Sequence, residues 1–221
     1  MSFQARRLRP SAAEPPELSL SSPVVRVQPR FGKTFGALGS GFLIEDWPSS
    51  IITARHVVVM ADGRAPSDVL VFGLSGGKWT SIATAVVSFP EGGGEAPDVA
   101  IVRVIARIHS PLKLGQFDDS THAEILGFPL KPAAPARSSR SPKTPYSVVA
   151  TEANRVADEI VLKDQGVVGM SGGPIIASST GEGPPLAVGI YLGPRDTGGG
   201  RAFVLASDAV IGAKDAAVQC L

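Results

Sequence analysis

The feature that most constrains the fold is a succession of short apolar or alternating runs, each ended by turn residues. The 25 glycines and 19 prolines of the chain fall largely between these runs. Short runs of this kind, separated by regular turns, are typical of β-sandwiches and β-barrels. The pattern therefore predicts an all-β fold with strands at 24–28, 41–46, 50–53, 68–74, 79–89, 99–105, 124–128, 146–151, 158–163, 174–178, 186–192 and 201–206.

The two ends of the chain have a different character. Residues 1–21 are rich in Pro, Ser and Ala and have little to bury, which predicts a flexible N-terminal tail before a domain at 22–221. Helix signals are few. The clearest begins at Ser207 or Asp208 as N-cap and predicts a short C-terminal helix.

Composition excludes several classes of protein. With 43% hydrophobic and 19% charged residues the chain can build a substantial core. A net charge of +1 gives no basic field for nucleic acid, and no apolar stretch is long enough to span a membrane. The single cysteine, Cys220, and an N-terminus without an apolar signal region favour a cytoplasmic location. No clustered His, Cys or carboxylate spacing predicts a metal, and no cofactor is expected.

A serine flanked by glycines stands in the run Gly-Met-Ser-Gly-Gly-Pro at 169–174. Glycines let the backbone turn sharply and approach a substrate carbonyl closely. The backbone N–H groups of Gly169 and Ser171 are then the expected donors to an oxyanion. The same letters fit G-x-S-x-G, the nucleophile turn of α/β-hydrolases, and also a plain glycine-rich turn without chemistry.

Chain order separates the two catalytic interpretations. In α/β-hydrolases the histidine of the triad follows the serine. All three histidines of this chain, His56, His109 and His122, precede Ser171, so that arrangement is not available. The order histidine, aspartate, serine remains, and it is one of the known orders of a serine triad.

His56 and Asp98 are the partners that this order suggests. His56 follows a predicted buried strand and a short turn, where a general base can be held rigidly. Asp98 opens the predicted strand 99–105, where a carboxylate can accept from an imidazole N–H and fix its tautomer. Taken singly, each residue also has a plain interpretation, as a histidine without a catalytic role and as an aspartate that merely starts a strand.

Together, three stretches resemble the motifs of the trypsin-like peptidase superfamily: Thr-Ala-Arg-His at 53–56, Asp-Val-Ala-Ile at 98–101 and the serine run at 169–174. The run Gly-Ser-Gly-Phe-Leu-Ile-Glu-Asp at 39–46 resembles the strand that these proteins place before the histidine. The likeness extends over roughly residues 24–215 and is to the compact bacterial branch without disulfides, which includes HtrA-type enzymes.

The resemblance implies a fold and an activity. The fold would be two six-stranded antiparallel β-barrels with the site in the cleft between them and a short C-terminal helix. The activity would be that of a serine endopeptidase acting on a protein or peptide, with His56, Asp98 and Ser171 as the triad and Gly169 and Ser171 as the oxyanion hole. Two alternatives stay open: a catalytically idle binding module on the same fold, and an esterase without a peptide substrate.

The sequence also departs from the digestive trypsins. It has no activation-type N-terminus, no disulfides, and Met170 in place of the aspartate that captures a freed α-amino group. The familiar activating salt bridge is therefore not available. The site is expected to be either constitutively formed or controlled by a regulatory partner protein or a loop transition.

The resemblance further implies where substrate binds. The pocket for the P1 side chain would lie between residues 165–168, residues 191–193 and the start of the strand at 201. If Arg201 points into its base, as the likeness of Arg-Ala-Phe to the Arg-Ala-Cys of granzyme B suggests, cleavage after Asp or Glu follows. A strand slip of one residue would instead turn Arg201 to solvent and leave a small or apolar pocket. The predicted substrate-binding residues are Gln165, Val168, Tyr191, Leu192 and Arg201.

Overall fold

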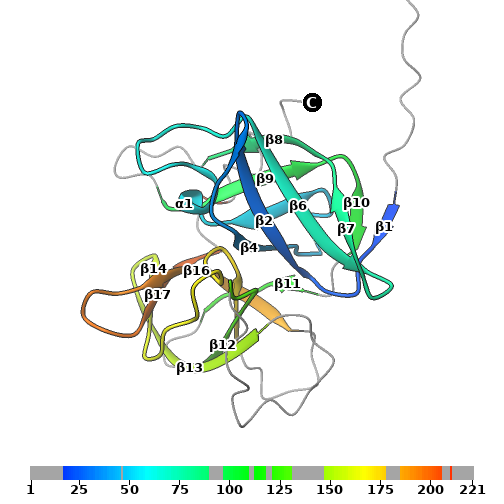
Figure 1. The fold of residues 1–221 in the computed structure, drawn as a ribbon. Helices are drawn as coiled ribbons and strands as arrows, with labels where there is room; N and C mark the ends of the chain where they lie inside the picture. The colour runs from blue at the N-terminus through cyan, green and yellow to red at the C-terminus, as the bar shows by residue number, and fades with distance from the viewer. Residues whose placement is uncertain are drawn as a thin grey trace, which may run out of the picture.

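The computed structural model describes residues 17–45, 47–89, 97–109, 112–117, 121–130, 147–177, 185–205 and 210. Within these ranges the chain is almost wholly β, and the one helix that is assigned, α1 (Arg55–Val58), has four residues. Figure 1 shows two β units, one above the other, with α1 in the upper unit. The prediction of an all-β fold is confirmed. The predicted C-terminal helix lies outside the described residues except for Val210.

The upper unit is an antiparallel half-barrel. Its strands run in the order β7-β6-β2-β4-β5-β9-β8, with β3 paired to β2. No ladder joins β7 to β8 among the described residues. The strands are β2 (Val24–Phe31), β3 (Thr34–Phe35), β4 (Gly39–Phe42), β5 (Ser50–Thr53), β6 (Asp68–Ser75), β7 (Lys78–Ile82), β8 (Thr84–Ser88) and β9 (Ala100–Val104).

Burial in the half-barrel follows the apolar pattern of the sequence. On β6 buried residues alternate with partly exposed ones, because successive side chains of a strand point to opposite faces. On β4 and β5 every residue is buried, since these strands lie in the middle of the sheet. β5 leads directly into α1, and β4 lies beside β5 in the sheet.

The lower unit is a closed barrel. Six strands follow in the order β16-β15-β12-β13-β14-β17, and pairing of β16 with β17 closes the ring. A short strand, β11, adds to β16 in parallel. The strands are β11 (Lys113–Leu114), β12 (Thr121–Gly127), β13 (Ser147–Val156), β14 (Glu159–Leu162), β15 (Pro174–Ala177), β16 (Leu186–Pro194) and β17 (Gly200–Val204). The expected pair of barrels is thus one closed barrel and one half-barrel.

The predicted strand at 79–89 is two strands. β7 pairs with β6, whereas β8 pairs with β9 at the other end of the sheet. The hydroxyl of Thr84, the first residue of β8, donates to the Val69 carbonyl of β6 over 2.9 Å. Apolar residues continue on both sides of the break, at 82–83 and 85–87, and no Gly, Pro, Asn or Asp marks a turn there. The sequence pattern therefore carries no sign of the change of partner.

A short strand lies within the stretch that the sequence assigns to the N-terminal tail. β1 (Glu17–Ser19) pairs in parallel with β10 (Arg107–His109). Leu18 and Leu20 pack against the core of the half-barrel, and the Ser21 N–H and hydroxyl both donate to the Leu74 carbonyl. Residues 17–21 therefore belong to the packed structure, while residues 1–16 lie outside the described ranges.

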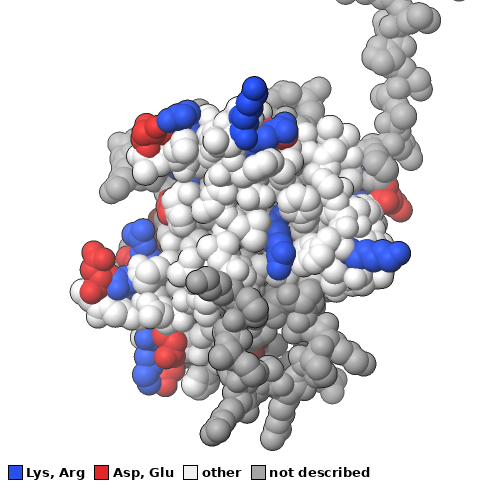
Figure 2. Space-filling view, viewed as in Figure 1, with Lys and Arg blue, Asp and Glu red and all other residues white. Residues whose placement is uncertain are grey.

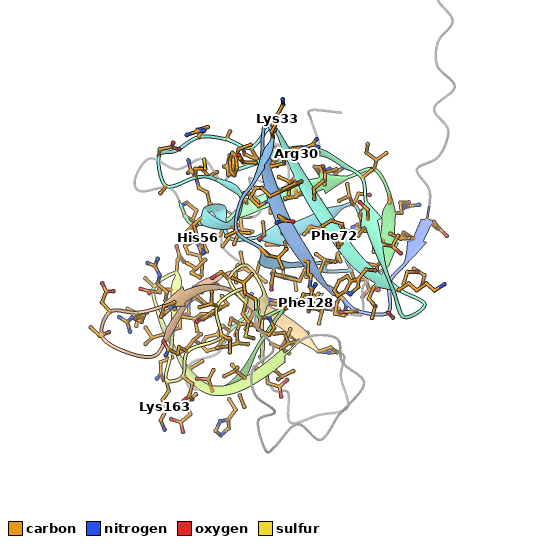
Figure 3. All side chains as sticks on the ribbon, in the orientation of Figure 1. Arg30, Lys33, His56, Phe72, Phe128 and Lys163 are labelled. Atoms are coloured by element: carbon orange, nitrogen blue, oxygen red, sulfur yellow. The ribbon has the colours of Figure 1, made fainter. Side chains whose placement is uncertain are left out.

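Aromatic and cationic side chains meet where the two units touch. The Arg26 guanidinium lies 4.4 Å from the ring centre of Trp79 and 5.1 Å from that of Phe128. The two rings contact each other edge to face with centroids 5.1 Å apart. Trp79 belongs to the half-barrel, and Phe128 follows β12 of the closed barrel. Figure 3 shows Phe128 at the boundary between the two units. The units are thus packed together through their side chains.

Candidate functional site

A histidine and an aspartate are in direct contact at the edge of the half-barrel. His56 Nδ1 lies 2.6 Å from Asp98 Oδ2, and the His56 backbone N–H donates to Asp98 Oδ1 over 2.8 Å. Both carboxylate oxygens of Asp98 therefore bind the same residue, His56. An imidazole that donates from Nδ1 carries its lone pair on Nε2 and can accept a proton there. Figure 3 shows His56 on the side of the half-barrel that faces the closed barrel.

The strands explain this contact. β5 and β9 pair with Thr53 opposite Ala100. His56 lies in α1, which begins two residues after β5 ends, and Asp98 lies two residues before β9 begins. A backbone bond from Arg55 N–H to the Asp98 carbonyl, 3.2 Å long, continues the contact beyond the ladder. The ladder therefore brings together two residues that are far apart in the sequence.

Glycines around Ser171 allow a turn that other residues would block. Gly172 has φ +85°, and a Cβ there would collide with the Ser40 carbonyl and the Thr53 hydroxyl. Gly169 has φ +100°, and a Cβ there would lie 2.6 Å from the Phe128 carbonyl oxygen. Both positions need glycine because L side chains rarely adopt these angles and have no room here.

The serine turn contacts both units. The Ser171 carbonyl accepts from the Ser40 N–H of β4 over 2.8 Å. The Gly172 N–H donates to the Tyr191 carbonyl of β16, also over 2.8 Å. A Cβ on Gly193 would lie 3.8 Å from Ser171 Oγ, so β16 borders the serine hydroxyl. Ser171 therefore lies where the closed barrel meets the half-barrel.

Three successive peptide groups before Ser171 are each held by their carbonyl. The Val168 carbonyl accepts from Leu130 N–H over 2.8 Å, the Gly169 carbonyl from Ser40 Oγ over 2.8 Å, and the Met170 carbonyl from Gly173 N–H over 2.9 Å. No described peptide bond is cis, so each N–H points away from the carbonyl of its own peptide group. The N–H groups of Gly169 and Ser171 have no hydrogen-bond acceptor in the described part of the chain.

The residues next to Ser171 are in contact with the residues just before His56. A Cβ on Gly172 would lie 2.9 Å from the Ala54 nitrogen, two residues before His56. Thr53 Oγ1 donates to the Ser40 carbonyl over 2.7 Å, and Ser40 in turn contacts Ser171. No hydrogen bond joins Ser171 Oγ to His56 among the described residues. Such bonds are often long in a free enzyme and tighten when substrate binds.

Met170 fills the interior beneath the serine turn. Its side chain is fully buried in the core of the closed barrel. Its Sδ accepts from Val167 N–H over 3.2 Å, and its own N–H donates to the Val167 carbonyl over 2.9 Å. Apolar burial and local hydrogen bonds thus hold the turn at the position where digestive trypsins carry an aspartate.

The residues predicted to bind substrate lie in different environments. Gln165 and Val168 are exposed, Val168 to 74%. Leu192 is buried. Tyr191 is 1% exposed, and its hydroxyl accepts from Gly166 N–H over 2.8 Å. Burial raises the pKa of Tyr191 against the smaller lowering effect of this bond, so the hydroxyl stays protonated at neutral pH.

The Tyr191 ring fills space between two glycines. A Cβ on Gly166 would lie 2.9 Å from one edge of the ring, and a Cβ on Gly200 would lie 3.0 Å from the other. Gly166 belongs to the segment that leads to Ser171, and Gly200 begins β17. Tyr191 belongs to one of the three segments that the sequence predicts as pocket walls. Its ring therefore occupies the space between the other two, residues 165–168 and the start of β17.

Arg201 is not brought together with these residues. It is exposed on β17, while Gly200 and Ala202 on either side of it are buried. It lines a surface hollow that also contains Glu159, Arg195 and Asp196. Its side chain thus faces solvent, as the alternative of a one-residue slip describes.

Comparison with protein families decides what kind of chain this is. The model of the trypsin-like peptidase domain matches residues 39–190, which is more than half of the sequence. The chain belongs to the trypsin-like peptidase family. A comparison with curated proteins found no match.

Solved structures share the fold of this trypsin-like peptidase. The protease Anisep from Arthrobacter nicotinovorans aligns with a TM-score of 0.65 at 10% identity, over 92% of this chain and 98% of its own. The thermostable serine protease AL20 from an extremophilic microorganism aligns with a TM-score of 0.61 at 13% identity, over 87% of this chain and 97% of its own. At these identities the likeness concerns the fold alone.

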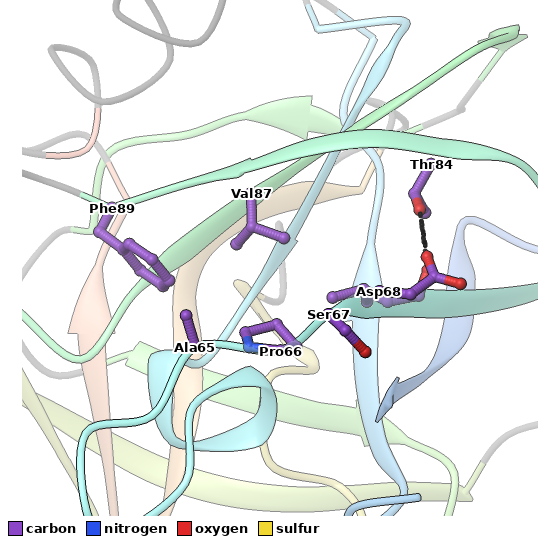
Figure 4. A pocket seen from close by; sticks show the side chains of 8 residues that line it. Ala65, Pro66, Ser67, Asp68, Thr84, Val87 and Phe89 are labelled. Carbon is purple, nitrogen blue, oxygen red and sulfur yellow. Dashed lines mark hydrogen bonds between the residues drawn. The ribbon is translucent and has the colours of Figure 1, made fainter. Parts of the chain in front are cut away.

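Other features of the peptidase lie away from the site. The hollow in Figure 4 is in the half-barrel, among residues 65–69, Thr84, Val87 and Phe89, and no residue of the candidate site lines it. Charged side chains of both signs are scattered over the face in Figure 2. In the described ranges no helix is long and apolar enough to cross a membrane, and no three His, Cys, Asp or Glu residues gather as a metal site requires.

Proposed function

We propose that the chain is a serine endopeptidase in which His56, Asp98 and Ser171 form the catalytic triad. The observation that carries this proposal is the double contact of Asp98 with His56, through Nδ1 and through the backbone N–H. It fixes both the tautomer and the direction of the ring. A lone carboxylate at the start of a strand would need neither contact.

The mechanism follows from these roles. Ser171 Oγ attacks the carbonyl carbon of the scissile peptide bond while His56 Nε2 accepts its proton. Asp98 stabilises the imidazolium that forms. The N–H groups of Gly169 and Ser171 donate to the oxyanion of the tetrahedral intermediate. His56 then gives its proton to the leaving amine, and water hydrolyses the acyl-enzyme by the same steps.

The held peptide groups support this assignment of the oxyanion donors. Each carbonyl from Val168 to Met170 is already bonded on the side away from the free N–H groups. Donors fixed in advance stabilise developing charge without the cost of reorienting during the reaction. Since the buried Met170 holds the turn, we expect the site to form without a released α-amino group. A cytoplasmic location and a regulatory partner stay predictions of the sequence.

A covalent probe tests the proposal against the idle binding module. A fluorophosphonate should phosphonylate the intact wild-type chain, and peptide mapping should place the adduct on Ser171. The intact mass should show an unprocessed N-terminus. An unlabelled wild type, or a label that persists in Ser171→Ala, would refute the triad. Casein and an activated ester, assayed side by side, separate a peptidase from an esterase, which would cleave only the second.

We also expect a preference for a small P1 residue, because the Tyr191 ring already fills the predicted pocket. Peptides with Gly, Ala or Ser at P1 should be cleaved best. Tyr191→Ala should raise kcat/KM for a Leu or Phe P1 relative to Ala by about 10-fold or more, as expected when a pocket gains room for several carbon atoms. Chromogenic peptides that differ only at P1 measure this ratio.

Arg201→Ala is the matched control for this prediction. Its side chain is exposed on the neighbouring strand, so it should leave the P1 preference unchanged. A wild type that prefers Asp or Glu and loses this preference in Arg201→Ala would contradict the assignment of Tyr191. Since truncation of a buried tyrosine lowers stability, the variants are compared below the unfolding temperature of each.

A further inference from the structure

Ser40 has an unusual set of contacts for a serine distant from Ser171 in sequence. It lies on β4 of the half-barrel and is fully buried. Its backbone N–H donates to the Ser171 carbonyl over 2.8 Å, and its carbonyl accepts from Thr53 Oγ1 over 2.7 Å. Its hydroxyl donates to the Gly169 carbonyl and accepts from Phe128 N–H, both over 2.8 Å. The N–H, the carbonyl and the hydroxyl of Ser40 therefore all form hydrogen bonds in or beside the serine turn.

The direction of the hydroxyl hydrogen is fixed by these partners. A serine hydroxyl has one proton to donate. The Phe128 N–H is itself a donor, so the proton of Ser40 must go to the Gly169 carbonyl. Neither bond can be reversed. Ser40 is therefore a fixed donor aimed at the peptide group between the two proposed oxyanion donors.

Gly169 depends on such bonds more than another residue would. A glycine can adopt positive and negative φ with similar ease, so its own conformational preference does not hold it at φ +100°. Two carbonyl contacts limit it here: Leu130 N–H holds the peptide group before it, and Ser40 holds the one after it. If the second contact is lost, the peptide group after Gly169 keeps only the bond from its own Met170 N–H to the Val167 carbonyl. A small rotation of that group would shift the neighbouring N–H groups of Gly169 and Ser171 out of line with the oxyanion.

We infer that Ser40 is a positioning residue, which holds the oxyanion donors of the closed barrel in register with the His56–Asp98 pair of the half-barrel. This inference rests on the proposed function. Ser40 does not contact substrate. It acts by fixing the Gly169 peptide group and the Ser171 carbonyl from β4, whose partner β5 leads to His56.

Replacement of Ser40 by alanine should therefore affect the transition state more than substrate binding. The substrate binds through contacts that Ser40 does not make, whereas the oxyanion forms only during the reaction. We expect kcat to fall about 10- to 100-fold, as is usual when catalytic groups are displaced by about 1 Å, with KM within about 3-fold of the wild type. The nearly isosteric Ser40→Cys, whose S–H is a weak donor, should have a kcat between those of the wild type and Ser40→Ala.

The experiment compares wild type, Ser40→Ala, Ser40→Cys and Ser22→Ala with a chromogenic peptide. Ser22 is the matched control, since it is also a buried serine of the half-barrel but its hydroxyl bonds only locally, with Val24. Thermal unfolding is recorded for each variant, and rates are measured well below the lowest unfolding temperature. A peptide boronic acid, which forms a tetrahedral adduct with the serine, is titrated as a second readout.

The expected result is a loss of kcat and of boronate affinity in Ser40→Ala, a partial return in Ser40→Cys, and kcat within about 2-fold of wild type in Ser22→Ala. An active wild type with unchanged kcat in a folded Ser40→Ala would overturn this inference and leave the proposed function intact. Equal losses of kcat in Ser40→Ala and Ser22→Ala would overturn it too, as effects of general destabilisation. If Ser40→Ala does not fold, Ser40→Cys decides by the same criteria. A wild type without turnover would overturn both proposals.

Discussion

Ser171→Ala is expected to lower turnover of a peptide substrate by about 10⁶-fold, since it removes the attacking oxygen and with it the acyl-enzyme route. The fold should not change. Among the described residues the Ser171 hydroxyl makes no hydrogen bond, and the backbone bonds of the turn do not depend on the side chain. Burst and steady-state kinetics with a chromogenic peptide measure the effect, and thermal unfolding checks that the variant is folded.

Ser81→Ala, an exposed serine of β7, provides the control for handling and purification. It should match the wild type in rate and in unfolding temperature. If purified Ser171→Ala keeps a tenth or more of the wild-type rate, the nucleophile is a different group. Titration with the fluorophosphonate recognises a contaminating peptidase. If the activity belongs to this chain, it falls in proportion to the fraction of Ser171 that is labelled, whereas the activity of a contaminant does not.

Asp98→Asn is expected to lower kcat by about 10⁴-fold while the site keeps its shape. The amide oxygen can still accept from the His56 backbone N–H, which leaves the amide NH₂ facing Nδ1. Nδ1 must then be the acceptor, and the ring proton moves to Nε2. An imidazole in that tautomer cannot take the proton of Ser171. Kinetics together with ¹⁵N chemical shifts of the His56 ring measure both the rate and the tautomer.

Asp68→Asn is a matched control for the loss of one charge. Asp68 also lies in the half-barrel, is of similar exposure, and pairs with Arg30 at 2.8 Å. Its replacement should leave kcat unchanged. A kcat of Asp98→Asn within 10-fold of the wild type, or an unchanged ring tautomer, would contradict the role proposed for Asp98.

Much of the fold could be predicted because strands depend on local pattern. The predicted strand at 50–53 agrees with β5 residue for residue, and that at 174–178 is one residue longer than β15. Very short strands such as β3 and β11 were missed, since two residues carry no periodicity. The break between β7 and β8 was missed because apolar residues continue through it, without a turn residue, while the pairing partner changes. Closure of one barrel and not the other depends on partners remote in sequence.

The candidate site likewise has parts that the sequence predicts and parts that it does not. The contact between His56 and Asp98 was predictable from short motifs next to strands, because the strands fix the geometry. The orientation of Arg201 was not, since three glycines precede it and a bulge interrupts the β16–β17 ladder between Tyr191 and Gly193. A shift of one residue reverses the face of a strand. The Ser40–Gly169 bond joins residues 129 apart, and no local pattern indicates such a bond.

The parallel pair of β1 and β10 bears on how this protein can be handled as a recombinant product. Trimming the chain to begin at 22 would remove β1 and uncover the unpaired edge of β10. It would also remove Leu20, whose methyl carbons would lie 2.7 and 2.8 Å from a Cβ on Gly73, and so expose the apolar surface that Leu20 covers. Exposed strand edges beside apolar surface promote aggregation. Beginning the chain at 17 instead keeps that edge covered.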